Sequence, residues 1–187
     1  GAFTSFRTAK SMKALGVNEV LIAHSEDRKG LERLLSLGGG NYDSNLLYHE
    51  EIARAEEAGL DILYCVGEKE DEQIHKYEVI KHQLEVGLKG HDLSHVTIAY
   101  EPVWAIGPGK VPPDEAYIRD IVRYIKSIVN VPVVYGGGLK KENALMLAGI
   151  PELDGGLIAL TRFGADFGFN LQDFQTIVAT YEKGLSA

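Results

Sequence analysis

Histidine and glutamate side chains follow two apolar runs of this sequence, and these residue types can together transfer protons. His24 comes directly after the run at 18–23, and Glu101 comes directly after the run at 96–100. If both runs are parallel strands, their carboxyl ends lie on one face, where ligands bind in α/β folds. An imidazole polarises a carbonyl group while a carboxylate removes a proton from the carbon beside it. The pair therefore indicates acid–base chemistry next to a carbonyl.

Each strand-end residue also has a purely structural interpretation. His24 can be satisfied by a backbone group, and Glu101 can be a buried carboxylate that is paired for stability. Cys65 alone is typical of a small buried apolar residue. The run Gly136–Gly138 either exposes backbone N–H groups to an anion or forms a flexible turn between a strand and a helix. The residue types alone leave these alternatives open.

Short apolar runs that alternate with longer amphipathic stretches are the elements that must position these side chains. The runs are continuous rather than alternating, which is typical of strands buried on both faces of a parallel sheet. We expect strands at 18–23, 61–67, 96–100, 131–135 and 157–160. We expect helices at 6–15, 42–57, 70–86, 113–129, 140–147 and 171–184. The pattern predicts about five βα units entered through a helix.

Strands that alternate with helices at this spacing indicate an α/β fold with right-handed crossovers. Two architectures fit: a (β/α)8 barrel and an open doubly wound sheet. No GxGxxG follows the first strand and no GxxxxGK[ST] occurs, which removes the main support for nucleotide binding. A whole (β/α)8 barrel takes about 250 residues. We therefore expect residues 1–187 to be one domain, a barrel whose first strands lie outside this sequence.

Composition excludes several classes of function. The chain has 187 residues, a net charge of -8, and 27 Asp and Glu against 19 Lys and Arg, so we expect no nucleic-acid partner. Its single cysteine excludes an intramolecular disulfide and a multi-cysteine metal site. His91 and His95 have the spacing of a metal-binding pair but no obvious third ligand, and we expect them, with the other histidines outside the strand ends, to be solvated. No membrane span or signal peptide is evident, so we expect a cytoplasmic protein without a membrane partner.

Five segments, in chain order, resemble one family. The segment AYEPVWAIGPGK at 99–110 resembles the signature of triosephosphate isomerases at nearly every position. IAHSEDR at 22–28 resembles the motif on the family's fourth strand, YCVGE at 64–68 the motif on its fifth, and VVYGGG at 133–138 the phosphate loop after its seventh. The opening GAFT at 1–4 is similar to the tip of the family's third loop. The resemblance thus covers the whole chain.

This resemblance implies a role for each matching residue. Glu101 would be the catalytic base, and His24 would be a neutral imidazole that polarises the substrate carbonyl, as is established for the family. Glu26 and Cys65 would support them. The phosphate would lie against Gly107, Gly137, Gly138, Ala159, Leu160 and Arg162, under a lid made of Pro102, Val103, Trp104, Ala105, Ile106, Pro108, Gly109 and Lys110. The family needs neither cofactor nor metal, and its third loop, Gly1–Thr4 here, would make a homodimer.

Several positions depart from the family pattern. The Asn and Lys of the family's first strand have no counterpart. Gly138 stands where Ser is usual, Ala159 and Leu160 stand where two glycines are usual, Asp27 replaces an Arg, and Pro108 replaces a Thr. The acid–base pair is kept while the phosphate cradle is altered. We hypothesise that Arg162, alone or together with Thr161, partly replaces the lost glycines by binding phosphate; alternatively, Arg162 makes a surface salt bridge.

Three functional hypotheses follow. The first is a cofactor-free isomerase of triose phosphates, acting in glycolysis and gluconeogenesis. The second is the same chemistry on another small sugar phosphate, such as a tetrulose phosphate, which the altered phosphate cradle favours. The third is a non-catalytic binding protein derived from a barrel, which the missing lysine favours. The spacing of His24 and Glu101 and the nearly complete lid argue against the third, because a binding protein needs neither.

Overall fold

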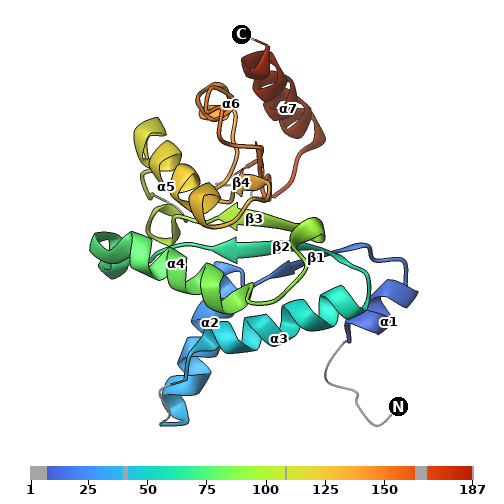
Figure 1. Ribbon diagram of the computed structural model, residues 1–187. Helices are drawn as coiled ribbons and strands as arrows, with labels where there is room; N and C mark the ends of the chain where they lie inside the picture. The colour runs from blue at the N-terminus through green and yellow to red at the C-terminus, as the bar shows by residue number, and fades with distance from the viewer. Residues whose placement is uncertain (1–7, 40–41, 108, 163–167, 187) are drawn as a thin grey trace.

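The computed structural model describes residues 8–39, 42–107, 109–162 and 168–186. Figure 1 shows strands and helices that alternate along the chain. The strands are β1 (Glu19–Ile22), β2 (Asp61–Val66), β3 (Val96–Tyr100), β4 (Val133–Tyr135) and β5 (Gly155–Gly156). The α-helices are α1 (Ala9–Ala14), α2 (Ser25–Leu37), α3 (Ser44–Glu57), α4 (Lys76–Gly87), α5 (Glu115–Ile128), α6 (Ala144–Ala148) and α7 (Leu171–Leu185). Short 3-10 turns lie at η1 (Glu70–His75), η2 (Leu93–His95) and η3 (Val103–Ala105).

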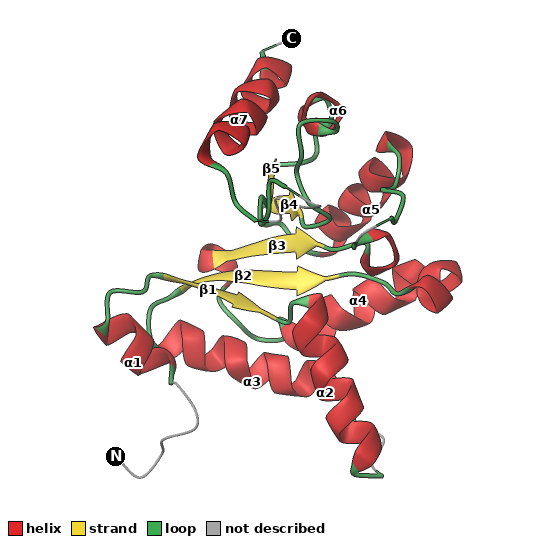
Figure 2. Ribbon diagram, turned by 180° about the vertical axis from the view of Figure 1, so that it is seen from behind, coloured by secondary structure: helices red, strands yellow, loops and turns green. Residues whose placement is uncertain are grey.

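The five strands form one parallel sheet whose spatial order, β1-β2-β3-β4-β5, is the order in the chain. The register places Ile22 beside Tyr64 and Cys65 beside Ala99, so the carboxyl ends of β1, β2 and β3 lie together. Figure 2 shows the arrows of these three strands pointing the same way. Within the described residues the sheet is open, with β1 at one edge and β5 at the other. Strands in chain order without a reversal form part of a (β/α)8 barrel rather than a doubly wound sheet, whose strand order reverses at a switch point.

Helix α5 illustrates how the sequence covers the sheet. Its residues Ile118, Ile121, Val122 and Ile125 are fully buried and recur at the spacing of one helical face. Asp114 caps the helix by accepting a hydrogen bond from the backbone N–H of Tyr117 at 2.8 Å. The neighbouring helices pack in sequence, α3 against α4 and α4 against α5. These contacts hold the strand ends in fixed relative positions.

Most of the expected elements are confirmed, and three need correction. Helix α2 was not expected; it has no buried residue and projects from the body of the molecule in both views (Figures 1 and 2). The last strand was expected at 157–160 but is the short β5, because its two glycines lie against Val134 and Leu139. Only the backbone of Leu157 continues the pairing, donating to the Tyr135 carbonyl at 2.9 Å. Helix α6 begins four residues later than expected, at Ala144.

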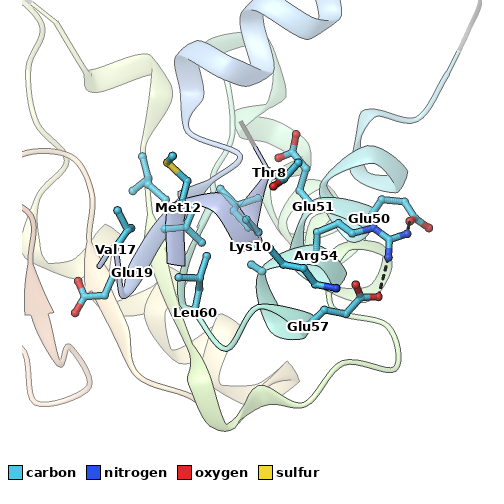
Figure 3. A pocket seen from close by; sticks show the side chains of 15 residues that line it. Thr8, Lys10, Met12, Val17, Glu19, Glu50, Glu51, Arg54, Glu57 and Leu60 are labelled. Carbon is cyan, nitrogen blue, oxygen red and sulfur yellow. Dashed lines mark hydrogen bonds and ion pairs between the residues drawn. The ribbon is translucent and has the colours of Figure 1, made fainter. Parts of the chain in front are cut away.

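A pocket of about 770 Å³ lies along the open edge of the sheet, between β1, α1 and α3 (Figure 3). Val20, Leu21 and Leu60 supply part of its apolar lining. At its rim Arg54 pairs with Glu50 and Glu57 on its own helix. The pocket lies along the outer edge of β1, where the described residues provide no further strand. Among those residues, no helix has both the length and the apolarity needed to cross a bilayer.

Candidate active site

His24 and Glu101 meet at the carboxyl ends of β1 and β3. The Nε2 atom of His24 lies 3.1 Å from Oε1 of Glu101. Glu101 is 2% exposed, whereas the His24 side chain is 35% exposed and so remains open to solvent on one side. Two residues that are 77 positions apart in the sequence are thus brought into hydrogen-bond distance by the parallel sheet.

The imidazole of His24 is oriented by the helix that it begins. His24 is the N-cap of α2, and its Nδ1 accepts a hydrogen bond from the backbone N–H of Glu26 at 3.4 Å. In a neutral imidazole only one ring nitrogen carries a proton, so the proton lies on Nε2, which faces Glu101. Ala23, directly before it, has φ 63, a conformation that is costly for a residue with a Cβ. The backbone is therefore strained at the point where it aims the histidine.

The carboxylate of Glu101 is buried and has a hydrogen-bond partner at each oxygen. Its Oε2 accepts from the backbone N–H of Ser25, the first residue of α2, at 2.9 Å. Burial raises the pKa of the Glu101 carboxyl above its ordinary value, while His24, the Ser25 N–H and the Cys65 thiol act in the opposite direction. Burial likewise raises the pKa of the Cys65 thiol, which therefore stays protonated beside the carboxylate. A base with a raised pKa holds a proton more readily than an exposed glutamate.

Two glycines allow the backbone to approach Glu101 closely. A Cβ at Gly67 would overlap the carbonyl oxygen of Glu101. A Cβ at Gly136 would lie 2.8 Å from Cγ of Glu101, closer than real contacts allow. The Gly136 N–H donates to the Tyr100 carbonyl at 2.7 Å, which ties β4 to the base-bearing strand. These glycines are needed for close packing around the base.

Arg28 braces the strand ends from α2. Its guanidinium donates to the carbonyl of Ala23 at 3.0 Å, to the carbonyl of Cys65 at 2.9 Å and to Oδ1 of Asn45 at 2.8 Å. One side chain thus joins the ends of β1 and β2. Arg28 could not be assigned this role from the sequence, because two of its three partners are backbone carbonyls, which leave no pattern in a sequence.

Glu68, which sequence analysis also left without a role, connects the strand ends to the lid segment. The carboxylate is fully buried and accepts hydrogen bonds from Trp104 Nε1 at 2.7 Å, Tyr117 Oη at 2.9 Å and Tyr100 Oη at 3.0 Å. Its backbone carbonyl also accepts from the N–H of Val103 at 3.1 Å. A lone acid directly after an apolar strand was the available signal, since buried charges need partners.

The remaining lid residues leave this anchor and run to the surface. Pro102 and Ala105 are buried, whereas Gly107, Gly109 and Lys110 are exposed. Gly107 and Gly109 have φ values of 119 and 75, which favour glycine. Lys110 lies 3.4 Å from Glu70 of η1. Pro108 lies outside the described residues.

The residues assigned to phosphate lie after strands rather than on them: Gly137 and Gly138 follow β4, and Ala159, Leu160 and Arg162 follow β5. Gly138 has φ 92, and its carbonyl accepts from the Asn143 side chain at 3.0 Å. A Cβ at Gly137 would overlap the Tyr135 hydroxyl. Ala159 is exposed and Leu160 is partly buried, in a segment without regular structure. The Nε atom of Arg162 pairs with Asp173 of α7 at 2.6 Å, so an ion pair engages the guanidinium that sequence analysis assigned to phosphate.

The other histidines differ in their surroundings. His91 was expected to be solvated, but its side chain is only 7% exposed, and it bonds Glu56 at 2.8 Å and His49 at 3.0 Å. His95 pairs separately with Asp61. Within the described part of the chain, no group of three or more His, Cys, Asp or Glu side chains is placed to hold a metal ion. Gly1–Thr4, expected to form a dimer contact, lies outside that part.

Comparison with known proteins identifies the family. The sequence model of the family described as "Triosephosphate isomerase" matches residues 1–180. A triosephosphate isomerase of Geobacter metallireducens is 36% identical over 89% of this chain and 68% of its own length. The corresponding proteins of Prosthecochloris aestuarii and Pelodictyon phaeoclathratiforme are 35% and 37% identical, over 98% and 95% of this chain and 71% and 69% of their own lengths. The chain therefore belongs to the triosephosphate isomerase family.

Proposed function

We propose that this protein is an isomerase that interconverts dihydroxyacetone phosphate and glyceraldehyde 3-phosphate. The observation that carries the proposal is the contact of 3.1 Å between Nε2 of His24 and Oε1 of Glu101, at the carboxyl ends of parallel strands. The proton on Nε2 and the buried carboxylate are the two groups that an aldose–ketose exchange needs. Membership of the family and the names of its curated relatives support the same reaction.

In this mechanism Glu101 takes the proton from the carbon beside the substrate carbonyl. The electron pair of that C–H bond moves to form an enediolate, and the Nε2–H of His24 stabilises the oxygen where negative charge develops. His24 then moves the hydroxyl proton from one enediolate oxygen to the other, and Glu101 returns its proton to the neighbouring carbon, which completes the exchange. Substrate and product have the same composition, so the reaction needs no oxidant, reductant or cofactor.

The lid and the glycine loop have supporting roles in the proposal. Closure of the segment from Pro102 to Lys110 excludes water from the enediolate, which would otherwise be protonated from solvent or lose its phosphate. Backbone N–H groups at Gly107, Gly137 and Gly138 bind the phosphate dianion. A homodimer through Gly1–Thr4 and a cytoplasmic role in glycolysis and gluconeogenesis belong to the same proposal, because the family implies them.

The decisive experiment measures interconversion of the two triose phosphates by the natural full-length protein, beside His24→Gln as a matched variant. Saturable turnover in the wild type, reduced at least ~100-fold in a folded His24→Gln, is the expected result. Absence of turnover with every sugar phosphate tested would favour the non-catalytic alternative.

A second candidate is isomerisation of a larger sugar phosphate such as a tetrulose phosphate. Ala159 and Leu160 stand where the family has glycines, and Leu160 restricts the approach of backbone N–H groups to a dianion. Arg162 would supply the replacing charge by exchanging Asp173 for phosphate. Comparison of kcat/KM for triose and tetrulose phosphates separates the two candidates. An unchanged KM for every sugar phosphate in Arg162→Ala would remove Arg162 from the site.

A further inference from the structure

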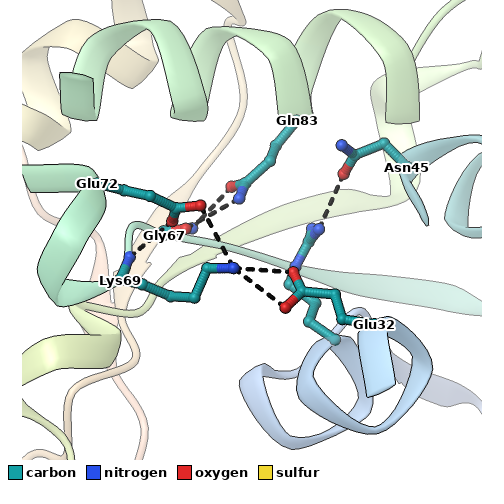
Figure 4. Close-up of polar contacts among 7 residues, drawn as sticks. Glu32, Asn45, Gly67, Lys69, Glu72 and Gln83 are labelled. Atoms are coloured by element: carbon teal, nitrogen blue, oxygen red, sulfur yellow. Dashed lines mark hydrogen bonds and ion pairs between the residues drawn. The ribbon is translucent and has the colours of Figure 1, made fainter. Parts of the chain in front are cut away.

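Gln83, in the second half of α4, forms hydrogen bonds with both the backbone N–H and the backbone carbonyl of Gly67 (Figure 4). Its side-chain oxygen accepts from the N–H of Gly67 at 2.8 Å, and its side-chain nitrogen donates to the carbonyl of Gly67 at 2.9 Å. Gln83 is 7% exposed, so both hydrogen bonds form away from water. Among the common side chains, only an amide provides a donor and an acceptor side by side for such a double contact.

The helix that carries Gln83 is itself fixed on β2. The Tyr64 hydroxyl donates to the backbone carbonyl of Gln83 at 2.9 Å and lies against Gly87, where a Cβ would overlap it. Tyr64 is fully buried and also receives an Arg28 N–H at 3.4 Å. These contacts with Tyr64 fix the backbone of α4 at Gln83, and so the position from which its side-chain amide reaches Gly67.

The glycine held by this amide lies between the base and the lid anchor. Gly67 packs so closely on the backbone of Glu101 that a Cβ would overlap the Glu101 carbonyl oxygen. The next residue, Glu68, binds the Trp104 indole and the Val103 N–H at the start of the lid segment. A shift of Gly67 would consequently displace both the base and the lid hinge.

We propose that Gln83 is a positioning residue that fixes Gly67 and Glu68, and through them sets the place of Glu101 and of Trp104. The part that concerns Glu101 rests on the proposed isomerase function, whereas the part that concerns Trp104 does not. A misplacement of about 1 Å at a catalytic group can reduce the rate ~100-fold, so a small movement of this backbone is sufficient to be measured.

The test compares Gln83→Met, which keeps the shape and removes both hydrogen bonds, with Ile177→Val on α7. Ile177 is 3% exposed, and its substitution removes one buried methyl group from α7, outside the contacts described for Gly67 and Glu68. We expect kcat of Gln83→Met to fall about 10–100-fold with KM within about threefold, because the phosphate contacts at Gly137 and Gly138 do not depend on Gly67. Ile177→Val should keep both constants.

Fluorescence of Trp104, the single tryptophan of the chain, provides a readout that needs no turnover. We expect the emission maximum to shift in Gln83→Met and to stay unchanged in Ile177→Val. A folded Gln83→Met with wild-type kcat, or with wild-type Trp104 emission, overturns the proposal. If Gln83→Met does not fold, the same criteria apply to Gln83→Asn, which keeps the amide but is too short to reach both groups. If the wild type proves not to be an isomerase, the emission result alone decides.

Discussion

On the proposed function, the Glu101 carboxyl must be ionised to act as a base, yet its buried site disfavours ionisation. The Ser25 N–H, the His24 imidazole and the Cys65 thiol compensate for the lost hydration only in part, and the balance leaves the pKa raised. Because a base acts only when it is deprotonated, activity should decline on the acid side at a pH above the ordinary range of glutamate.

Replacement of Glu101 by Gln keeps the shape of the side chain and removes the base. We expect turnover to fall by at least ~10²–10⁴-fold with little loss of folding, because the amide oxygen still accepts from Ser25 or His24. Steady-state kinetics and a thermal melt of the full-length protein check this expectation. Turnover within tenfold of wild type would refute the assignment of the base.

The same substitution should change the dependence of stability on pH. A carboxyl whose pKa is higher in the folded state binds its proton more tightly there, so its contribution to stability is complete below the unfolded pKa and is lost as pH rises through the folded pKa. Glu101→Gln should therefore gain Tm relative to wild type at pH 8, and this gain should vanish near pH 4. An equal difference in Tm at both pH values would show that the pKa is not raised.

Residue types identified His24 and Glu101 as candidates, but not the residues that hold them in place. His24 and Glu101 could be identified because a charged or titratable group directly after an apolar strand is unusual, and Cys65 because it shares that edge of the sheet. Ser25 and Arg28 act through backbone groups of other elements, which a sequence does not display. Glu68 was visible as an acid after a strand, but its three donors come from three separate segments.

At the scale of the element, strands in which most residues are buried could be predicted from the sequence, whereas elements with few or no buried residues could not. β3 was predicted at its observed bounds because four of its five residues are buried. Helix α2 was missed although Leu31, Leu34 and Leu35 recur at helical spacing, because its first six residues are polar or glycine and none of its residues is fully buried. β5 was misplaced because the apolar run after it made the stronger signal, whereas the pairing residues are two glycines.

The tip of the lid segment should move relative to Trp104 when a phosphate-bearing ligand binds. Trp104 is attached to the buried Glu68, whereas Gly107 and Gly109 are exposed, so the change of backbone conformation concentrates between these points. We expect the emission of Trp104 to change on saturation with a non-reacting phosphate-bearing inhibitor. Chloride at the same ionic strength is the control, and identical emission in both would count against a closing lid.

Gly67 should tolerate no side chain. In Gly67→Ala the new Cβ meets the Glu101 backbone, and such overpacking typically costs about 1–3 kcal/mol. Gly30→Ala is the matched control, because nothing lies within 4 Å of its Cβ position on the exposed face of α2. We expect Gly67→Ala to lower the midpoint of urea unfolding and Gly30→Ala to raise it slightly. Equal midpoints for the two variants would contradict the close approach.

At the scale of the whole molecule, the open edge of β1 is the feature most open to association. Leu21 on this edge is 44% exposed and lines the apolar pocket of Figure 3. Unpaired strand edges with apolar side chains pair with other chains, and a lysine there opposes such pairing. In this 187-residue polypeptide we expect Leu21→Lys to reduce concentration-dependent light scattering. Leu47→Lys is the control, because Leu47 is 45% exposed on α3, and it should change light scattering little. An equal reduction in both variants would show that association does not occur through the edge of β1.

The order of the strands has a consequence for how the molecule is built during synthesis. From β2 onward, each strand pairs with the strand that precedes it in the chain, so no strand needs a later segment for its first pairing. All the groups described in contact with Glu101, from His24 to Gly136, precede residue 137. As the ribosome releases the chain from its N-terminus, the acid and the base can come together while α6 and α7 are still unmade. The described contacts of His24 and Glu101 therefore require no residue of α6 or α7.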